Sequence, residues 1–386
     1  MSRTLLIGLD GATFTVLDRL MDSGVMPELR ALCRRGVRAD LLSTPNPLTP
    51  AAWTSLLTGR SPGHHGIFDF VRVEELGYHP QFRLATSSDI RCRTLWSILT
   101  EQGRRSIGLN FPVMFPPRPL EGFLIPGFVP QRHLRQAMYP PGLYDRLRAL
   151  PDLNLQEITV DFEEERRSVQ VLARERYEEW VRFHIRREQQ WFGVMHHLME
   201  SEPWDLAAVV FDGVDKLQHI CWRFLDDRLF PASTAEPWER RVRDLCLDYF
   251  RRLDDLIARL LEIAGPETRV VLASDHGFGP SDEIFYVNTW LGQQGHLEWR
   301  DGVPLAEEGM LNTEGMKTPA FLFNWERTHA YTLTPGSNGI YLRLPGGGAA
   351  GSPGRESLCR QIAAALLEVT NPATGERVVR RAMTRE

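Results

Sequence analysis

The sequence predicts an α/β fold in which helices flank a largely parallel central sheet. Four short apolar runs, each closed by polar or glycine residues, have the pattern of strands buried on both faces. They cover residues 5–9, 105–109, 205–211 and 269–273. Segments with a helical spacing of apolar residues lie between them, at residues 29–35, 94–102 and 240–263. Strands that alternate with helices are typical of a parallel sheet with crossover helices.

Length and composition indicate an ordinary globular protein. The chain has 386 residues, of which 42% are hydrophobic and 25% are charged, and this excludes coiled-coil, collagen-like and generally disordered proteins. The 50 acidic and 45 basic residues give a net charge of -5, which favours neither a nucleic acid duplex nor anionic lipid as a partner. A small-molecule substrate is the better expectation.

Cysteine usage and the N-terminus bear on the compartment. Five scattered cysteines without a CxxC pair do not predict a disulfide framework. The first apolar stretch is too short for a signal peptide, and no run of about 18 apolar residues predicts a membrane span. We expect a cytoplasmic protein, and the sequence leaves its oligomeric state open.

We expect one domain over residues 1–386 that carries an insertion. Residues 110–160 are rich in proline and glycine, as irregular segments are. A charged stretch with helical spacing follows over residues 162–200 and predicts an amphipathic helix. Residues 110–200 are therefore the predicted insertion or lid. A last helix is predicted over residues 356–368, after a glycine-rich segment.

Polar side chains follow three of the predicted strands. Ligands of an open parallel sheet bind outside the carboxyl ends of its strands, so these side chains should converge. Carboxylates and imidazoles suit zinc or manganese, and a spacing of four residues places two of them on one helical face. Each aspartate taken alone is more typical of a turn or a helix N-cap. The candidates are Asp10, Asp212, Asp215, His219, Asp275 and His276.

Thr49 is the candidate nucleophile. It precedes Pro50, a residue suited to the first position of a helix, so Thr49 is the predicted N-cap. At that place the helix dipole and a bound cation would stabilise an alkoxide and an incoming phosphoryl group. From this segment alone, a purely structural cap is the better interpretation.

Taken together, these motifs resemble the alkaline phosphatase superfamily, specifically its type I phosphodiesterase/nucleotide pyrophosphatase branch. The matching segments are residues 8–11, 48–59, 62–67, 215–219 and 274–277. The resemblance implies an alkaline-phosphatase-like fold with a helical insertion, and phosphoric ester hydrolysis through a phospho-threonine intermediate on Thr49. It also implies two divalent metal ions, with zinc expected first and manganese second. By position, one ion takes Asp10, Thr49, Asp275 and His276 as ligands, and the other takes Asp215 and His219.

Two departures from the family pattern affect what the resemblance implies. Nucleotide pyrophosphatases carry an asparagine shortly after the nucleophile loop, where this chain has apolar residues, so nucleotide specificity is not inherited. Family members also supply a third ligand, a histidine in a late glycine-rich loop, to the ion of Asp215 and His219. We interpret His296, His329 and Asp282 as ordinary surface, helix-end or turn residues. We therefore expect a missing C-terminal ligand segment and a weak second ion.

The expected function is hydrolysis of a phosphodiester or a related small phosphate ester. One alternative is a catalytically impaired or non-catalytic member of the family that binds metal or phosphate. Another is a phosphotransferase or phosphomutase of the same superfamily. A sulfatase is disfavoured, because Thr49 lacks the C/S-x-P-x-R context that formylglycine formation needs.

Overall fold

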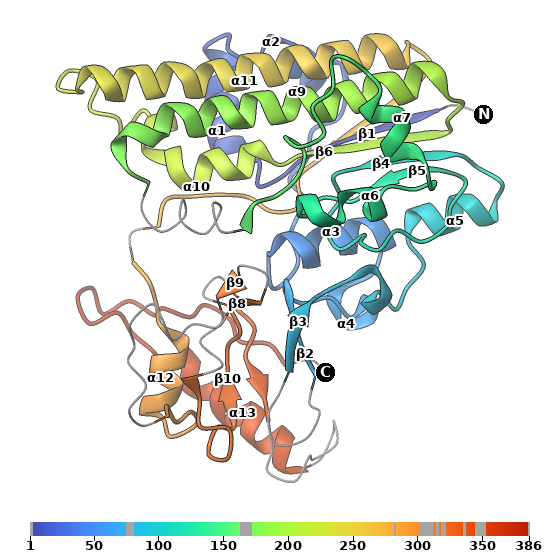
Figure 1. Ribbon diagram of the computed structural model, residues 1–386. Helices are drawn as coiled ribbons and strands as arrows, with labels where there is room; N and C mark the ends of the chain where they lie inside the picture. Colours follow the sequence, from blue (N-terminus) through green and yellow to red (C-terminus); the bar gives the residue numbers. More distant parts are fainter. Residues whose placement is uncertain are drawn as a thin grey trace. The chain divides into compact units, whose positions relative to one another are not determined.

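Figure 1 shows the computed structural model of the chain, which describes residues 3–74, 81–162, 172–281, 283–300, 312–313, 316–317, 322–334, 337–343 and 353–384. The chain divides into two compact units. The sheet unit comprises Met1–Phe68 and Ala85–Pro280, and the second unit comprises Asp69–Leu84 and Ser281–Glu386. Each unit has a hydrophobic core of its own.

A five-stranded parallel sheet with the order β5-β4-β6-β1-β7 forms the centre of the sheet unit. Its strands are β1 (Thr4–Leu9), β4 (Ser106–Leu109), β5 (Gly122–Ile125), β6 (Leu206–Phe211) and β7 (Arg269–Ala273). The predicted α/β class is confirmed. Because β1 lies between β6 and β7, the residues that follow these three strands meet at one edge of the sheet.

One strand of this sheet, β5, was not predicted. Within the sheet it pairs with β4, with Gly122 opposite Ser106, and its Leu124 also forms an isolated antiparallel bridge with Tyr139. The three-residue apolar run between Gly122 and Pro126 is too short to be told apart from irregular structure by its pattern. The proline-rich region was therefore expected to lack strands.

The inner strands of the sheet are apolar because helices cover both faces of the sheet. The edge strand β7 was predicted to be buried on both faces, but Val271 is 40% exposed, because an edge strand is covered less completely than an inner one. Leu5, Ile7 and Leu9 of β1 join one core and Leu6 joins the other, and β6 alternates in the same way. Helices cover both faces of the sheet (Figure 1). We call the face with Leu5, Ile7 and Leu9 the first face and the face with Leu6 the second face. Those on the first face are α1 (Phe14–Asp22), α2 (Pro27–Arg35), α9 (Tyr177–Ser201), α10 (Gly213–Leu225) and α11 (Pro237–Ala264), and those on the second are α3 (Thr49–Thr58) and α5 (Leu95–Glu101).

Shorter helices complete the sheet unit. These are α4 (Pro62–His65), α6 (Leu134–Ala137) and α7 (Leu143–Arg148), with single 3₁₀ turns at Ser87–Asp89, Gln131–His133 and Arg174–Arg176. Helices predicted over residues 29–35, 94–102 and 240–263 are confirmed as α2, α5 and α11.

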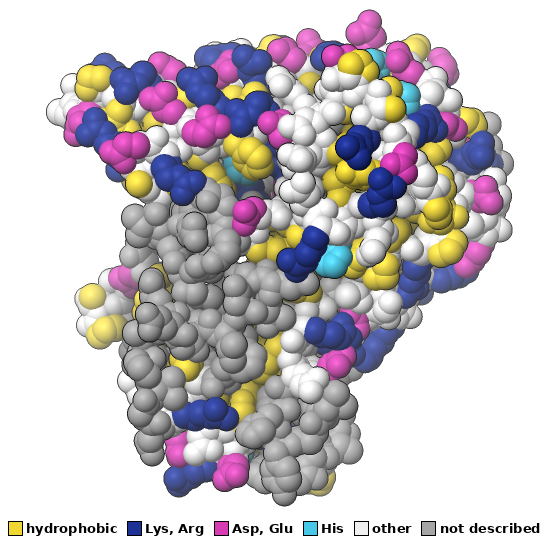
Figure 2. Space-filling view, viewed as in Figure 1, with side chains coloured by type: hydrophobic (Ala, Val, Ile, Leu, Met, Phe, Trp, Pro, Cys, Tyr) yellow, Lys and Arg dark blue, Asp and Glu magenta, His cyan; other side chains and the backbone are white. Residues whose placement is uncertain are grey.

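The outer surfaces of α9 and α11 carry charges of both signs. Arg241 of α11 pairs with Glu178 of α9 at 2.9 Å, and Arg252 pairs with Asp248 at 2.7 Å. Figure 2 shows acidic and basic side chains intermingled over this part of the surface. A mixed surface of this kind lacks the single-sign field that steers nucleic acid.

Gly8 lies in β1 at a point where a side chain has no room. A Cβ atom there would be 2.5 Å from Trp53 Cη2 and 2.9 Å from Val210 Cγ2. Gly8→Ala is expected to lower the free energy of unfolding by about 1–3 kcal/mol through overpacking, measured by equilibrium urea unfolding. Gly63→Ala is the matched control, because the nearest atom to its Cβ is 3.9 Å away. Equal stability of the two variants would contradict the prediction.

The described residues of the second unit form short hairpins and two helices around aromatic side chains. The ring of Trp325 lies 5.5 Å from Phe323 and 4.9 Å from Tyr331, centroid to centroid. The predicted helix over residues 356–368 is confirmed as α13. The elements are β2 (Val71–Glu74), β3 (Gln81–Leu84), α12 (Val287–Gln293), β8 (Asn312–Thr313), β9 (Met316–Lys317), β10 (Ala330–Tyr331), β11 (Tyr341–Leu342) and α13 (Pro353–Leu367).

Among the described helices, none has the length and apolar character needed to cross a lipid bilayer. The cytoplasmic location stays a prediction. So does the single domain over residues 1–386 with an insertion or lid at residues 110–200.

Candidate functional site

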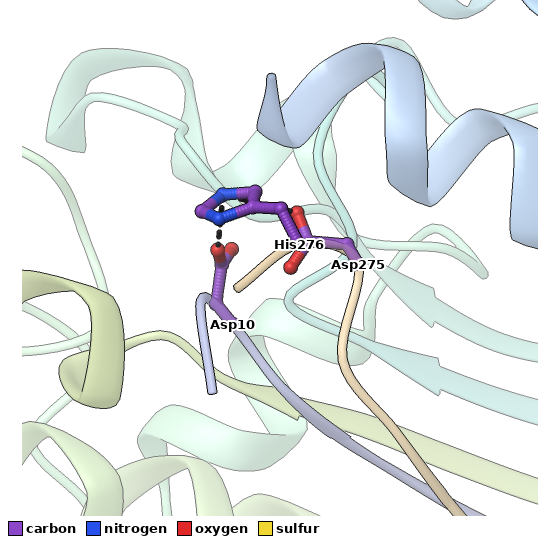
Figure 3. Close-up of side chains that lie close together, drawn as sticks. All are labelled: Asp10, Asp275 and His276. Atoms are coloured by element: carbon purple, nitrogen blue, oxygen red, sulfur yellow. Dashed lines mark ion pairs between the residues drawn. The ribbon is translucent and has the colours of Figure 1, made fainter. Parts of the chain in front are cut away.

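Four predicted site residues meet at the carboxyl edge of the sheet. Asp10 directly follows β1, and Asp275 and His276 follow the neighbouring strand β7. His276 Nε2 lies 3.5 Å from Asp10 Oδ1, 3.4 Å from Asp275 Oδ2 and 3.3 Å from Thr49 Oγ1. Figure 3 shows the imidazole over the Asp10 carboxylate, with Asp275 beside it. We call Asp10, Thr49, Asp275 and His276 the first half-site.

The backbone fixes which nitrogen of His276 faces the cluster. His276 Nδ1 lies 2.9 Å from the Gly277 carbonyl oxygen. A carbonyl can only accept, so Nδ1 carries a hydrogen, and Nε2 is the nitrogen that faces the carboxylates and could bind a cation there. Two serine hydroxyls hold the same loop, since Ser43 donates to the Asp275 carbonyl and Ser274 donates to the His276 carbonyl, each at 2.6 Å. This is the arrangement that orients a metal-binding imidazole.

The carboxylates of the first half-site are buried and incompletely bonded. Asp10 Oδ1 and Asp275 Oδ2 have no hydrogen-bond partner among the described residues, while their second oxygens accept from Trp53 and Gly11. Burial raises the pKa of Asp10 well above its ordinary value, and the charges of Asp275 and Asp215 add to the effect. Burial likewise raises the pKa of Asp275 to about 8. Orphaned buried carboxylate oxygens of this kind fit a bound cation.

The spacing of the donors suits a small divalent ion. Asp10, Asp275 and His276 form a group whose donor atoms all lie within 4.8 Å of one another. Donors bound to a tetrahedral zinc at about 2.0–2.1 Å are about 3.3–3.4 Å apart. The separations of 3.3, 3.4 and 3.5 Å from His276 Nε2 match this value. The residues present therefore fit the metal that the motifs imply.

Asp215 and His219, which we call the second half-site, lie on one face of the first turns of α10. His219 Nε2 is 3.5 Å from Asp215 Oδ1, and the His219 ring lies edge-on to Phe278 at 4.8 Å. Burial raises the pKa of Asp215, but the charge of His219 and a hydrogen bond from it outweigh this and bring the pKa to about 2. Asp215 is thus the ionised carboxylate of the site.

A buried network anchors the start of α10. Glu188 accepts from the Gly213 N–H at 2.7 Å and from the Tyr249 hydroxyl at 2.9 Å. Arg187 donates two bonds of 3.3 Å to Asp212. Asp212, one of the polar residues noted after a strand, is therefore engaged by an arginine and stabilises the fold rather than facing the first half-site.

Thr49 corrects one detail of the sequence prediction. It was expected to be the N-cap of its helix, but Leu48 is the N-cap, with φ -95° and ψ 141°, and α3 begins at Thr49 itself. Its side chain makes no capping hydrogen bond. Because Pro50 suits the second helical position as well as the first, the sequence could not separate the two placements. The shift leaves the hydroxyl directed at His276.

Trp53 has a role that the sequence analysis did not identify. It lies one helical turn after Thr49, and its indole N–H donates to Asp10 Oδ2 at 3.1 Å. We expect Trp53→Phe to weaken zinc binding about tenfold, because a hydrogen bond to a metal-binding carboxylate holds that carboxylate in its binding orientation. Calorimetric zinc titration measures the effect.

Trp96→Phe is the matched control for this prediction. Both indoles lie edge-on to Phe111, at 5.5 Å for Trp53 and 5.4 Å for Trp96. The Trp96 N–H has no hydrogen-bond partner among the described residues. An equal loss of affinity in both variants would show that ring packing, and not the bond to Asp10, is responsible.

The clustered carboxyls also predict how pH affects the metal-free chain. With the pKa of Asp275 raised to about 8, the folded chain retains a proton that the unfolded chain releases near pH 4. The contribution of Asp275 to the free energy of unfolding of chelator-treated protein should therefore fall as pH rises between about 4 and 8. Burial lowers the pKa of His65 and of His184 and gives these groups contributions of the opposite sign, so the thermal melts in EDTA compare wild type with Asp275→Asn. The melting temperature of wild type minus that of Asp275→Asn should decrease across this range, and an increase would contradict the prediction.

Two other residues of the matching segments, His65 and Lys216, lie in the sheet unit. His65 is buried and braces α3, with Nε2 at 2.9 Å from Ser55 Oγ and Nδ1 accepting from the Ile67 N–H. Lys216 is partly buried, with its ammonium 5.2 Å from the centre of the Phe128 ring. His296 and His329 lie in the second unit, where the His329 N–H donates to the His296 carbonyl. Asp282 lies outside the described residues.

Comparison with known proteins identifies the family. The sequence model described as type I phosphodiesterase/nucleotide pyrophosphatase matches residues 4–341. The chain belongs to this family. This match confirms the family that the motifs predicted. It also confirms the predicted enzyme class, phosphoric ester hydrolase. No curated protein matches the sequence.

Solved structures with the same architecture are distant in sequence. Phosphonoacetate hydrolase from Sinorhizobium meliloti is 15% identical, and the match covers 96% of this chain and 74% of that one with a TM-score of 0.50. Murine ectonucleotide pyrophosphatase/phosphodiesterase 5 is 13% identical over 79% of this chain and 65% of that one, with a TM-score of 0.42. A putative sulfatase from Bacteroides thetaiotaomicron is 14% identical over 72% and 59%, with a TM-score of 0.42. The likeness to the phosphonoacetate hydrolase supports the fold of this family member.

Proposed function

We propose that this chain hydrolyses phosphodiesters or related small phosphate esters with Thr49 as the nucleophile and two divalent ions, zinc or manganese, as cofactors. One observation carries the proposal: the Thr49 hydroxyl lies 3.3 Å from His276 Nε2, beside buried carboxylate oxygens that lack partners among the described residues. A hydroxyl in such surroundings is suited to become an alkoxide. Thr49, Asp10, Asp275 and His276 would hold one ion, and Asp215 and His219 the other.

The proposed reaction has two in-line steps. Thr49 Oγ forms a bond to phosphorus and the leaving alcohol departs, which gives a phospho-threonine. Water then attacks this phosphorus, the bond to Thr49 breaks, and the hydroxyl is restored. Bound divalent ions supply Lewis acidity, which lowers the pKa of the attacking hydroxyl and water and neutralises the phosphoryl charge. The positive end of the α3 dipole and the backbone N–H groups after Thr49 would stabilise the charge on the phosphoryl oxygens.

Assays with bis-p-nitrophenyl phosphate and p-nitrophenyl phosphate test this function. Chelator-treated chain should be inactive, and zinc or manganese should restore turnover. An acid-quenched reaction should yield a phosphorylated peptide that contains Thr49, identified by mass spectrometry. Turnover that is unaffected by chelation, or modification at another residue, would overturn the proposal.

A second candidate function is a binding member of the family with little turnover. It is favoured by the second half-site, because α10 supplies two predicted ligands where catalytic zinc sites have three protein ligands, and His219 remains 46% exposed. Metal stoichiometry separates the two candidates: two ions per chain favour the hydrolase, and one ion favours the binding member.

A further inference from the structure

Gly11 lies between the two half-sites and bonds to elements of both. Its N–H donates to Asp275 Oδ1 at 3.1 Å, and its carbonyl accepts from Gln218 Nε2 at 2.7 Å. Asp275 belongs to the first half-site, whereas Gln218 lies on α10, next to His219 of the second. A single residue thus connects a ligand loop on β7 to the ligand helix.

Only glycine fits at this position. The backbone of Gly11 has φ +64°, and a Cβ atom would be 2.9 Å from Asp215 Oδ1 and 3.3 Å from Asp215 Cα. Asp215 and Gln218 are three residues apart and lie on the same face of α10. That face packs directly against the Gly11 turn, so the position of Asp215 relative to Asp10 depends on this contact.

The buried side chain of Gln218 makes a hydrogen bond in addition to its packing contacts. Its side chain is 1% exposed, and its Oε1 has no hydrogen-bond partner among the described residues. Its Nε2 bond satisfies the carbonyl of Gly11, which is itself buried. Loss of that donor would leave a buried carbonyl unpaired, and the turn could rotate to find another partner. Rotation of the turn would redirect the N–H that holds Asp275.

We propose that Gln218 is a positioning residue that couples the two half-sites through Gly11. Gln218 touches neither Asp275 nor any other side chain of the first half-site through a described hydrogen bond, and it acts on that half-site only through the Gly11 turn. Because a fixed turn orients Asp275 and α10 together, occupation of one half-site favours the geometry of the other. This inference rests on the two-ion site proposed above.

Calorimetric titration of zinc into the chelator-treated full chain tests the coupling. Gln218→Met keeps the length of the side chain and removes the donor. We expect both zinc-binding steps to weaken about tenfold or more, as is usual when a group that orients metal ligands is lost. Gln190→Met is the matched control, since Gln190 accepts a backbone hydrogen bond from Asn154 at 2.7 Å on α9 and should leave both steps unchanged.

Several outcomes would overturn the coupling. Weakening of one step alone would show that Gln218 acts only on its own helix, and weakening of neither step would show that the bond to Gly11 has no role. If circular dichroism shows Gln218→Met to be unfolded, Gln218→Asn tests the same bond, because it keeps the amide but is one methylene too short to reach Gly11.

Failure of this inference is distinguishable from failure of the proposed function. If the wild-type chain binds two ions and hydrolyses esters while Gln218→Met leaves both zinc-binding steps unchanged, only the proposed coupling is overturned. If the wild-type chain binds two ions without hydrolysing esters while Gln218→Met weakens both zinc-binding steps, only the proposed enzymatic function is overturned. Fewer than two ions in the wild type overturns both proposals.

Discussion

Thr49→Val is expected to lower kcat/KM for p-nitrophenyl ester hydrolysis by about a thousandfold or more, because it removes the nucleophilic oxygen and changes little else. Valine has the shape of threonine, and α3 does not use the Thr49 side chain as a cap. Asp10, Asp275 and His276 keep their positions, so zinc binding should weaken only modestly. Thr49→Ser should recover part of the rate, since it restores a hydroxyl.

Thr54→Val on the same helix is the control for this substitution. Thr54 is fully buried, and its hydroxyl has no hydrogen-bond partner among the described residues. Its removal should leave the rate unchanged and the stability equal or slightly higher. Steady-state kinetics and thermal melts of both variants settle the comparison. Comparable rates for Thr49→Val and Thr54→Val would remove Thr49 from the chemistry.

The second large effect is expected for Asp275→Asn. It removes a charged ligand from the first half-site, so bound metal should fall from two ions to one, and kcat/KM should fall at least about a hundredfold. The substitution should change the melting temperature in opposite directions in the metal-free and the zinc-loaded protein. The metal-free variant should melt higher than metal-free wild type at neutral pH, because one of the crowded carboxyl groups is gone. The zinc-loaded variant should melt lower.

Asp254→Asn provides the matched control for Asp275→Asn. Asp254 is also buried, but it accepts from the Glu28 and Leu29 N–H groups at 2.8 and 2.9 Å at the start of α2. Its replacement should leave metal content and rate unchanged. Elemental analysis after gel filtration gives the metal content. Two ions retained by Asp275→Asn would exclude this carboxylate as a ligand.

The convergence of the site was predictable from the sequence because parallel strands impose it. Once β1 and β7 are neighbours in a parallel sheet, the residues that follow them must share an edge, and Asp10 and His276 meet there. The spacing of Asp215 and His219 placed both on one helical face in the same way. These inferences need only the order of apolar runs and the geometry of regular elements.

The contacts that orient those side chains could not be predicted. The bond from Trp53 to Asp10 and the bond from Gln218 to Gly11 depend on which faces of α3 and α10 pack on the turn after β1. Periodicity places Trp53 one turn after Thr49 but equally allows a core role. The exact start of α3 depends on the backbone angles of Leu48, which its sequence leaves open.

The position of β1 between β6 and β7 has a consequence for biosynthesis. The N-terminal strand pairs on one side with β6 and on the other with β7, and Gly11 is separated from its partner Asp275 by 264 residues. Contacts of such long range form late, since the loop that joins them must close first. A nascent chain on the ribosome therefore cannot assemble the first half-site until β7 has emerged, and zinc added to shorter nascent chains should find no complete set of ligands.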